Sequence, residues 1–468
     1  MSKQAIWQWL DSHEPMLYDI ARQTWERPEL PFQEHQASAL HAATLERAGF
    51  RVRKDFPDLP TALVAEYGAG PPILGILGEY DALANLSQQV ASECRPVAPG
   101  APGHGCGHNL LGTAGLGAAL AFQQSIAAQQ SPGTIRYYGC PAEESLAGKV
   151  FMARAGAFRD LDACLTWHPA CMNVVWGCSF LALNSVIFTF HGVAAHAASA
   201  PEMGRSALDA VELMNVGANY LREHVSEKAR IHYTITNGGG APNIVPAEAA
   251  VWYYCRAPKR AMVEEIYERL TKIAQGAALM TDTRVDWQLQ AGCYDVLANR
   301  CLGELLDQNM REVGPPRFTD EDRTFAKALA GSFTPSQKAK VMQAYFAPPE
   351  ILALDLHEEI LTLDDHREVL AGSTDVGDVS WIVPLAQFTA ATWPVGTAAH
   401  SWQAAASSGS GIGRKAMHFA AKTLAGALYD LYSDGGKRLQ DAKAEFVRCT
   451  AGNPYKSPLP DGVKPPSK

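Results

Sequence analysis

The spacing of hydrophobic and polar positions predicts alternating helices and strands over about the first 170 residues. Apolar side chains recur at helical spacing in three segments, and three others are short and continuously apolar, like strands buried on both faces. The predicted helices span residues 4–27, 34–48 and 110–128, and the predicted strands span 72–78, 134–140 and 163–167. This alternation is typical of an α/β domain with a mostly parallel sheet.

A different pattern begins near Leu181. Segments of alternating polarity predict strands, and two amphipathic segments predict helices. The expected order is strand 185–191, helix 204–224, strands 230–236 and 249–256, helix 263–280 and strand 285–290. We expect a separate α+β domain at 183–292, inserted into a catalytic domain made of residues 1–182 and 293–468. The pattern predicts no elements for 315–369, and the proline-rich tail from Asn453 is expected to be extended and exposed.

Composition narrows the class of protein. A net charge of -9 argues against nucleic acid as a partner, because phosphate binding needs basic surface. No apolar stretch reaches the roughly 18 residues that suggest a membrane span, and the first residues lack the apolar segment of a signal peptide. The ten cysteines form no CxxC pair. We therefore expect a cytoplasmic protein with reduced thiols, independent of membranes.

Side chains that bind metals occur at a few separate places along the chain. A glycine-rich turn carries a thiol and an imidazole two residues apart, and further candidates follow predicted strands or apolar segments. The candidates are Cys106, His108, Glu143, Glu144, His168 and His400. Taken singly, each is more often a structural residue. Together they combine the three side-chain types that bind zinc-like cations, at the strand ends where open α/β sheets place their sites. The set predicts a metal-dependent hydrolase in which Cys106 is the metal-bound cysteine.

Several motifs of the chain resemble those of the aminoacylase/carboxypeptidase-type metallopeptidases. The resemblance covers essentially the whole sequence. Its main motifs are Gly78-Glu-Tyr-Asp-Ala-Leu83, His104-Gly-Cys-Gly-His-Asn109, Pro141-Ala-Glu-Glu144, Trp167-His-Pro169, Gly204-Arg-Ser-Ala-Leu-Asp-Ala210, Gly372-Ser-Thr-Asp-Val-Gly-Asp378 and Val395-Gly-Thr397.

This resemblance implies a site for two divalent metal ions, zinc or manganese. The implied ligands are Cys106, His108, Glu144, His168 and His400. Glu143 would be the general base, a division of duties that makes chemical sense because a carboxylate already bound to metal is a poor base. Many relatives have Asp where this chain has Asn109, which leaves the metal preference open.

The same resemblance makes the inserted domain a lid and dimerisation domain. His196 would stabilise the tetrahedral oxyanion, in such dimers on the partner's site, and Asn243 would contact the substrate. Arg256 would hold the substrate's carboxylate, a role suited to its forked guanidinium. The alternatives are an ordinary loop histidine and a local salt bridge of Arg256.

The expected activity is hydrolysis of an amide bond to a carboxylate-bearing amino acid, with p-aminobenzoyl-glutamate as the implied substrate. A dipeptidase or an N-acyl-amino-acid hydrolase, for example on acyl-aspartates, is the alternative among enzymes, because fold analogy cannot decide the substrate. The expected assembly is a homodimer or a heteromer with a related subunit. A third possibility is a partner chain that needs a related A subunit for activity.

Overall fold

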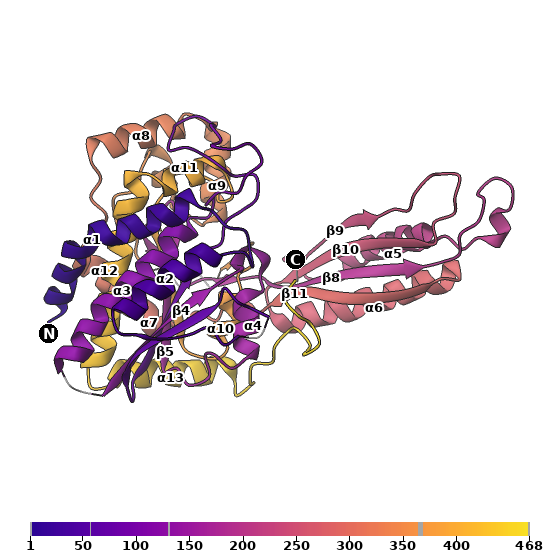
Figure 1. The fold of residues 1–468 in the computed structure, drawn as a ribbon. Coiled ribbons are helices and arrows are strands. Elements are labelled where there is room, and N and C mark those ends of the chain that lie inside the picture. Colours follow the sequence, from indigo (N-terminus) through magenta and orange to yellow (C-terminus); the bar gives the residue numbers. More distant parts are fainter. Residues whose placement is uncertain (1, 57, 130–131, 364–367, 467–468) are drawn as a thin grey trace.

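The computed structural model describes residues 2–56, 58–129, 132–363 and 368–466. A broad part built around a seven-stranded sheet carries a slender extension built on a four-stranded sheet (Figure 1).

The large sheet has its four central strands parallel to one another. Its order is β1 (Arg51–Arg53), β2 (Leu63–Ala69), β4 (Gly133–Cys140), β3 (Ile73–Glu79), β5 (Ala163–Ala170), β13 (Leu385–Ala391) and β6 (Val174–Val175). Strands β4, β3, β5 and β13 form the parallel centre, whereas β2 and β6 run antiparallel to their neighbours and β1 runs antiparallel to β2. The α/β prediction is confirmed. The sheet is mixed because its edges are extended by antiparallel strands.

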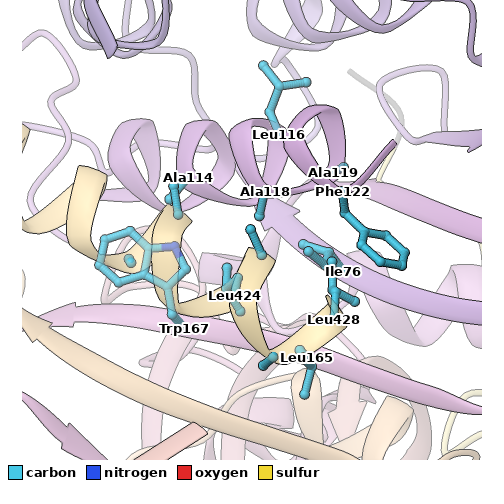
Figure 2. Packing of buried hydrophobic residues seen from close by; sticks show 14 of the residues in the cluster. Ile76, Ala114, Leu116, Ala118, Ala119, Phe122, Leu165, Trp167, Leu424 and Leu428 are labelled. Atoms are coloured by element: carbon cyan, nitrogen blue, oxygen red, sulfur yellow. The ribbon is translucent and has the colours of Figure 1, made fainter. Parts of the chain in front are cut away.

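Helices cover both faces of this sheet. They are α1 (Lys3–Glu26), α2 (His35–Arg47), α3 (His108–Gln129), α4 (Gly148–Arg154), α7 (Arg300–Val313), α10 (Val376–Ser380), α11 (Trp402–Ser408), α12 (Gly411–Ser433) and α13 (Lys437–Thr450). Figure 2 shows α3 packed against side chains of β3, β5 and α12, including Ile76, Leu165 and Leu424. By length and composition α3 could cross a membrane, but it is a buried core helix.

Close packing of α3 against β3 helps to position the site. A Cβ on Gly112 would lie 2.4 Å from the backbone oxygen of Glu79, so only glycine allows this approach. The first turn of α3 therefore lies beside the carboxyl end of β3. His108, the first residue of α3, is brought close to Glu79 in this way.

The slender extension has the element order that the sequence pattern predicts. It consists of β8 (Ala182–His191), α5 (Ala207–Leu221), β9 (Arg230–Asn237), β10 (Glu248–Ala257), α6 (Arg260–Thr281) and β11 (Arg284–Cys293). The strands form an antiparallel sheet in the order β11-β8-β10-β9. Because this unit has its own hydrophobic core, we propose that it is the inserted domain.

The segment 315–369, for which the pattern predicts no elements, contains regular structure. It forms α8 (Asp320–Ala330), α9 (Pro335–Ala344), the 3-10 helix η4 (Pro349–Ala353) and the start of β12 (Val369–Leu370), which pairs with β7 (Ser179–Phe180). Both helices begin with a capping box, formed by Thr319 with Asp322 and by Thr334 with Gln337. These S/T-x-x-D/Q signals were present in the sequence and could have located the helices.

The C-terminal tail is not fully exposed, which corrects the expectation for it. Leu459 is buried, and the Tyr455 hydroxyl donates a hydrogen bond of 2.8 Å to the Asp378 carboxylate. Arg154 donates to the carbonyl of Pro460. Residues 453–466 form no helix or strand, but an apolar and an aromatic residue among the prolines anchor them beside α4 and α10.

Candidate metal centre

The metal-binding candidates gather at the carboxyl edge of the parallel strands. β3 ends at Glu79, and β4 ends at Cys140, just before the 3-10 turn that carries Glu143 and Glu144. His168 lies within β5, opposite Thr389 of β13, and not beyond the strand as the sequence pattern suggested. β5 is longer than predicted because Pro169 and Ala170 still pair with β13.

Two loops converge on the glycine-rich turn. Gly107 adopts a left-handed conformation (φ 74°), which lets the chain turn between Cys106 and the start of α3. The backbone N–H of His400 donates to the carbonyl of Gly105 at 2.9 Å. His400 itself has φ 59°, an uncommon conformation for a residue other than glycine. The turn and the C-terminal loop are thus tied together, although about 300 residues of sequence separate them.

The side chains of all five implied ligands and of Glu143 lie close together. Cys106 Sγ is 3.5 Å from His168 Nε2, and His400 Nε2 is 3.2 Å from Glu144 Oε2. His108 Nε2 is 4.0 Å from Glu143 Oε2. Three overlapping groups have their ligand atoms within 4.8 Å of one another: Cys106, His108 and His168; Cys106, Glu144 and His400; and Glu79, His108 and Glu143.

Neighbouring groups orient two of the imidazoles. His108 Nδ1 donates to Asp81 Oδ1 at 2.7 Å, and His168 Nδ1 donates to the carbonyl of Pro169 at 2.7 Å. Both rings therefore turn Nε2 toward the cluster, the arrangement found for metal-bound histidines. Asp81 also accepts a hydrogen bond from the backbone N–H of Glu144 at 2.9 Å. One buried carboxylate thus supports candidates on two different loops.

Charges within the cluster favour a bound cation. Burial opposes ionisation of the Cys106 thiol, but the imidazoles of His168 and His108 lower its pKa to about 6. Burial would lower the pKa of both imidazoles, yet Asp81 and Cys106 raise that of His108 well above its ordinary value, and Cys106 raises that of His168. The anionic groups thus attract positive charge, which a divalent cation can supply.

The donor atoms also fit a divalent cation. His108 Nε2, Glu144 Oε1 and Glu79 Oε2 are buried, and none has a hydrogen-bond partner within the described part of the chain. Leaving such atoms unpaired costs about 1–3 kcal/mol each, and more when they are charged. Thiolate, imidazole and carboxylate are the ligand types that zinc and related ions accept. The residues present therefore fit a metal centre.

A cavity of about 410 Å³ opens onto this cluster. Its lining includes the cluster residues Cys106, Glu143, His168 and His400. The lining also includes four apolar or aromatic side chains, which we call the aromatic wall: Trp176, Phe180, Tyr345 and Leu370. The Trp176 ring stacks on His168, with centroids 5.4 Å apart, and meets Phe180 edge-on at 5.0 Å.

Arg256 lines the same cavity from β10 of the slender extension. Its guanidinium lies over the Tyr254 ring, 5.5 Å from the centroid. The buried Nε atom has no hydrogen-bond partner among the residues described. The local salt bridge considered as an alternative is not among the ion pairs of the described residues. The guanidinium of Arg256 thus offers the cavity a positively charged hydrogen-bond donor.

His196 and Asn243 are not brought to this cluster within one chain. They belong to the loops after β8 and between β9 and β10, at the end of the extension farthest from the large sheet (Figure 1). The two loops contact each other, since the Ala197 N–H donates to the carbonyl of Asn243. His196 is exposed, and its Nδ1 accepts from the backbone N–H groups of Ala198 and Ser199.

Several residues of the site were given no role from the sequence. Glu79, Lys149 and the aromatic wall were missed, although Glu79 and Lys149 are charges in otherwise apolar segments, a signal of pairing or function. Asn109 does not face the cluster, because its amide donates to the carbonyls of Ala21 and Ser408. His104 bonds to the carbonyl of Thr24, and burial lowers its pKa to about 3.

Comparison with known proteins supports the resemblance. Residues 182–280 match the family model described as a peptidase dimerisation domain. The chain is 43% identical to the B subunit of p-aminobenzoyl-glutamate hydrolase from Escherichia coli, over 96% of this chain and 95% of that protein. It is 32% identical to mouse Xaa-Arg dipeptidase, over 67% of this chain and 72% of that protein.

The fold also matches solved structures. A dinuclear metal-binding peptidase of the M20 family from Bacillus subtilis superposes with a TM-score of 0.53, covering 88% of this chain and 98% of that one at 17% identity. Such a likeness supports the fold, whereas the similarity to the E. coli protein extends along nearly the whole sequence. The chain therefore belongs to the M20 family of metal-dependent amidohydrolases and peptidases, the aminoacylase/carboxypeptidase-type family that its motifs resemble.

Proposed function

We propose that this protein hydrolyses the amide bond between an aromatic acyl group and a carboxylate-bearing amino acid, with p-aminobenzoyl-glutamate as the first candidate substrate. One observation carries the proposal: a single cavity joins the metal-binding cluster, the aromatic wall and the guanidinium of Arg256. A flat acyl ring, a scissile amide and a free carboxylate match these three surfaces. The name of the E. coli relative describes such a substrate.

The metal centre is proposed to hold two divalent ions, zinc or manganese. Its ligands are Cys106, His108, Glu144, His168 and His400, whose ligand atoms form overlapping groups. Bound ions would polarise the substrate carbonyl and lower the pKa of a water molecule.

Glu143 is proposed to be the general base that takes a proton from the attacking water molecule. Burial raises its pKa well above the ordinary carboxyl value, and the nearby charge of Glu79 adds to this effect. A carboxylate with a raised pKa accepts a proton from the attacking water more readily and can then pass it to the leaving nitrogen. Both neighbouring glutamates line the cavity, but Glu144 pairs with His400, whereas Glu143 belongs to the group with Glu79 and His108.

Arg256 is proposed to bind the substrate's carboxylate through two parallel hydrogen bonds. His196 and Asn243 would act on the site of a second subunit, because their loops lie at the far end of the extension (Figure 1). The presence of a peptidase dimerisation domain agrees with this arrangement. The second subunit would be another copy of this chain or a related protein, since the name of the E. coli relative describes that protein as one of two kinds of subunit.

We propose the cytoplasm as the location. All ten cysteines are free, including the exposed Cys94 and Cys449, as expected in a reducing compartment.

A substrate panel with metal analysis tests the proposal. The purified chain, reconstituted with Zn²⁺ or Mn²⁺, is offered p-aminobenzoyl-glutamate, acyl-aspartates, acyl-glutamates and dipeptides, including Xaa-Arg. We expect the highest kcat/KM for p-aminobenzoyl-glutamate and about two ions per chain. Preference for dipeptides would favour the dipeptidase alternative. Activity only after addition of a related subunit would favour the partner-chain alternative, and no hydrolysis under any condition would refute the proposal.

A further inference from the structure

One carboxylate oxygen beside the cluster has no role in the scheme above. Glu79 Oε2 lies 3.3 Å from His108 Nε2, the imidazole nitrogen that faces the cluster. The two atoms are not aligned for a hydrogen bond, and both are buried without a partner in the described ranges. Only 2% of the Glu79 side chain is exposed, so water from the surface does not satisfy it.

The other oxygen of Glu79 is held firmly. Lys149 Nζ is 2.6 Å from Glu79 Oε1 and 2.5 Å from Asp375 Oδ1. The backbone N–H of Lys149 also donates to Asp375 Oδ2 at 2.8 Å. Lys149 and Asp375 are fully buried, on α4 and just before α10. This Glu79–Lys149–Asp375 chain fixes the plane of the Glu79 carboxylate and leaves Oε2 directed at the cluster.

The three charged side chains Glu79, Lys149 and Asp375 do not form a neutral group by themselves. Two carboxylates share one ammonium group, and the remaining negative charge faces the His108 imidazole, whose Nε2 lies 3.3 Å from Glu79 Oε2. A purely structural ion pair would be neutral, because an uncompensated buried charge is strongly destabilising. Glu79 Oε2 also belongs to a group with His108 and Glu143 whose ligand atoms lie within 4.8 Å of one another. Geometry and charge therefore both favour a divalent cation between Glu79 and His108, in place of the proton on His108 Nε2.

We propose that Glu79 is a further residue of the metal site, whose Oε2 binds one of the two divalent ions beside His108. Lys149 and Asp375 are positioning residues, which hold the Glu79 carboxylate in this orientation. The inference rests on the metal centre proposed above. It adds a hard oxygen ligand beside His108, whereas Cys106 offers its thiolate to both of the other groups.

The test is metal binding by the E79Q variant, measured without reference to activity. Glu79→Gln leaves Lys149 paired with Asp375, so the buried charges become balanced and the fold should persist, as checked by circular dichroism. Metal-free protein is titrated with Zn²⁺ and Mn²⁺ in competition with a chromophoric chelator, and bound metal is counted by mass spectrometry. We expect one of two ions to bind about tenfold or more weaker, or to be lost, while the other keeps its affinity.

Glu34→Gln is the matched control. Glu34 is also fully buried, its Oε1 accepts from the backbone N–H groups of Phe32 and Ala142, and its Oε2 has no partner in the part of the chain described. It belongs to none of the metal-capable groups, so E34Q should bind both ions as the wild type does. If E79Q proves unstable, Glu79→Asp, which withdraws the carboxylate by one methylene, should show the same selective weakening.

The outcomes separate this inference from the proposed function. Two ions bound with unchanged affinity by E79Q, or by E79D where E79Q does not fold, would overturn the role of Glu79 and leave the metal centre standing. Absence of metal binding in the wild type itself would instead refute the metal centre. Equal weakening by E34Q and E79Q would mean that loss of any buried carboxyl group near the cluster, and not loss of Glu79 as a ligand, lowers the affinity, and would also overturn the inference.

Discussion

Replacing Trp176 with alanine tests whether the aromatic wall selects the acyl group of the substrate. Trp176 contacts the rings of His168 and Phe180, with centroid distances of 5.4 and 5.0 Å, so its own ring is fixed beside the cavity. Stacking of a substrate ring on this surface contributes about 0.5–1.5 kcal/mol, and the area removed from water adds about 1 kcal/mol at about 25 cal/mol per Å². The sum of about 2 kcal/mol corresponds to a loss of roughly 30-fold in kcat/KM.

The assay compares two substrates that differ only in the acyl group. Steady-state kinetics are measured for p-aminobenzoyl-glutamate and for N-acetyl-glutamate, which has a methyl group in place of the ring. Trp176→Ala should lower kcat/KM chiefly for the aromatic substrate, mainly through KM, and Trp176→Phe, which keeps a ring, should lose much less. The metal content of each variant shows whether His168 still binds. Equal losses on both substrates would refute the reasoning, because they would indicate damage to the metal centre and not to an acyl-binding surface.

Three further predictions concern the general base, the binding of the substrate's carboxylate and the dependence of stability on pH. Glu143→Gln should lower kcat by about 10²–10⁴-fold while the metal content is unchanged; an unaltered rate would remove Glu143 as the general base. Arg256→Ala should cost about 1.5–3 kcal/mol in kcat/KM for substrates with free carboxylates, and an equal loss on their amidated counterparts would contradict the assignment. Burial and the nearby charge of Asp81 raise the pKa of Glu34 to about 7. Its contribution to stability is therefore complete below the unfolded value of about 4.5 and is lost as pH rises through about 7. Metal-free E34Q should match the wild type near pH 4 and exceed it by up to about 3 kcal/mol at pH 8, as measured by denaturant unfolding; parallel pH profiles would refute this.

The cysteines show how much of a thiol's ionisation can be predicted from the sequence alone. Cys106 was expected to be the ionised cysteine because of its glycine-rich turn with His108, and its pKa is indeed lowered to about 6. By contrast, burial raises the pKa of Cys140, Cys164 and Cys255, which are core residues. An imidazole two residues away was visible in the sequence, whereas His168, which lowers the pKa most, is a neighbour only in the folded chain.

Hydrophobic periodicity by itself determined the element order of the slender extension, several central helices and strands of the broad part, and the strands near which metal-binding residues would gather. It could do so because burial on one or two faces imposes a local pattern of side chains. The periodicity did not find the helices of 315–369, whose starts are marked by capping residues, or the anchoring of the tail by Tyr455 and Leu459.

Only the tertiary structure decided which distant residues share the site. The Glu79–Lys149–Asp375 chain, the aromatic wall and the approach of Arg256 join segments that lie far apart in sequence. No local pattern encodes such contacts, because they depend on how strands, helices and loops pack together. The separation of His196 and Asn243 from the metal-binding cluster is likewise set by the length and direction of β8 and β10, which carry their loops away from the large sheet (Figure 1).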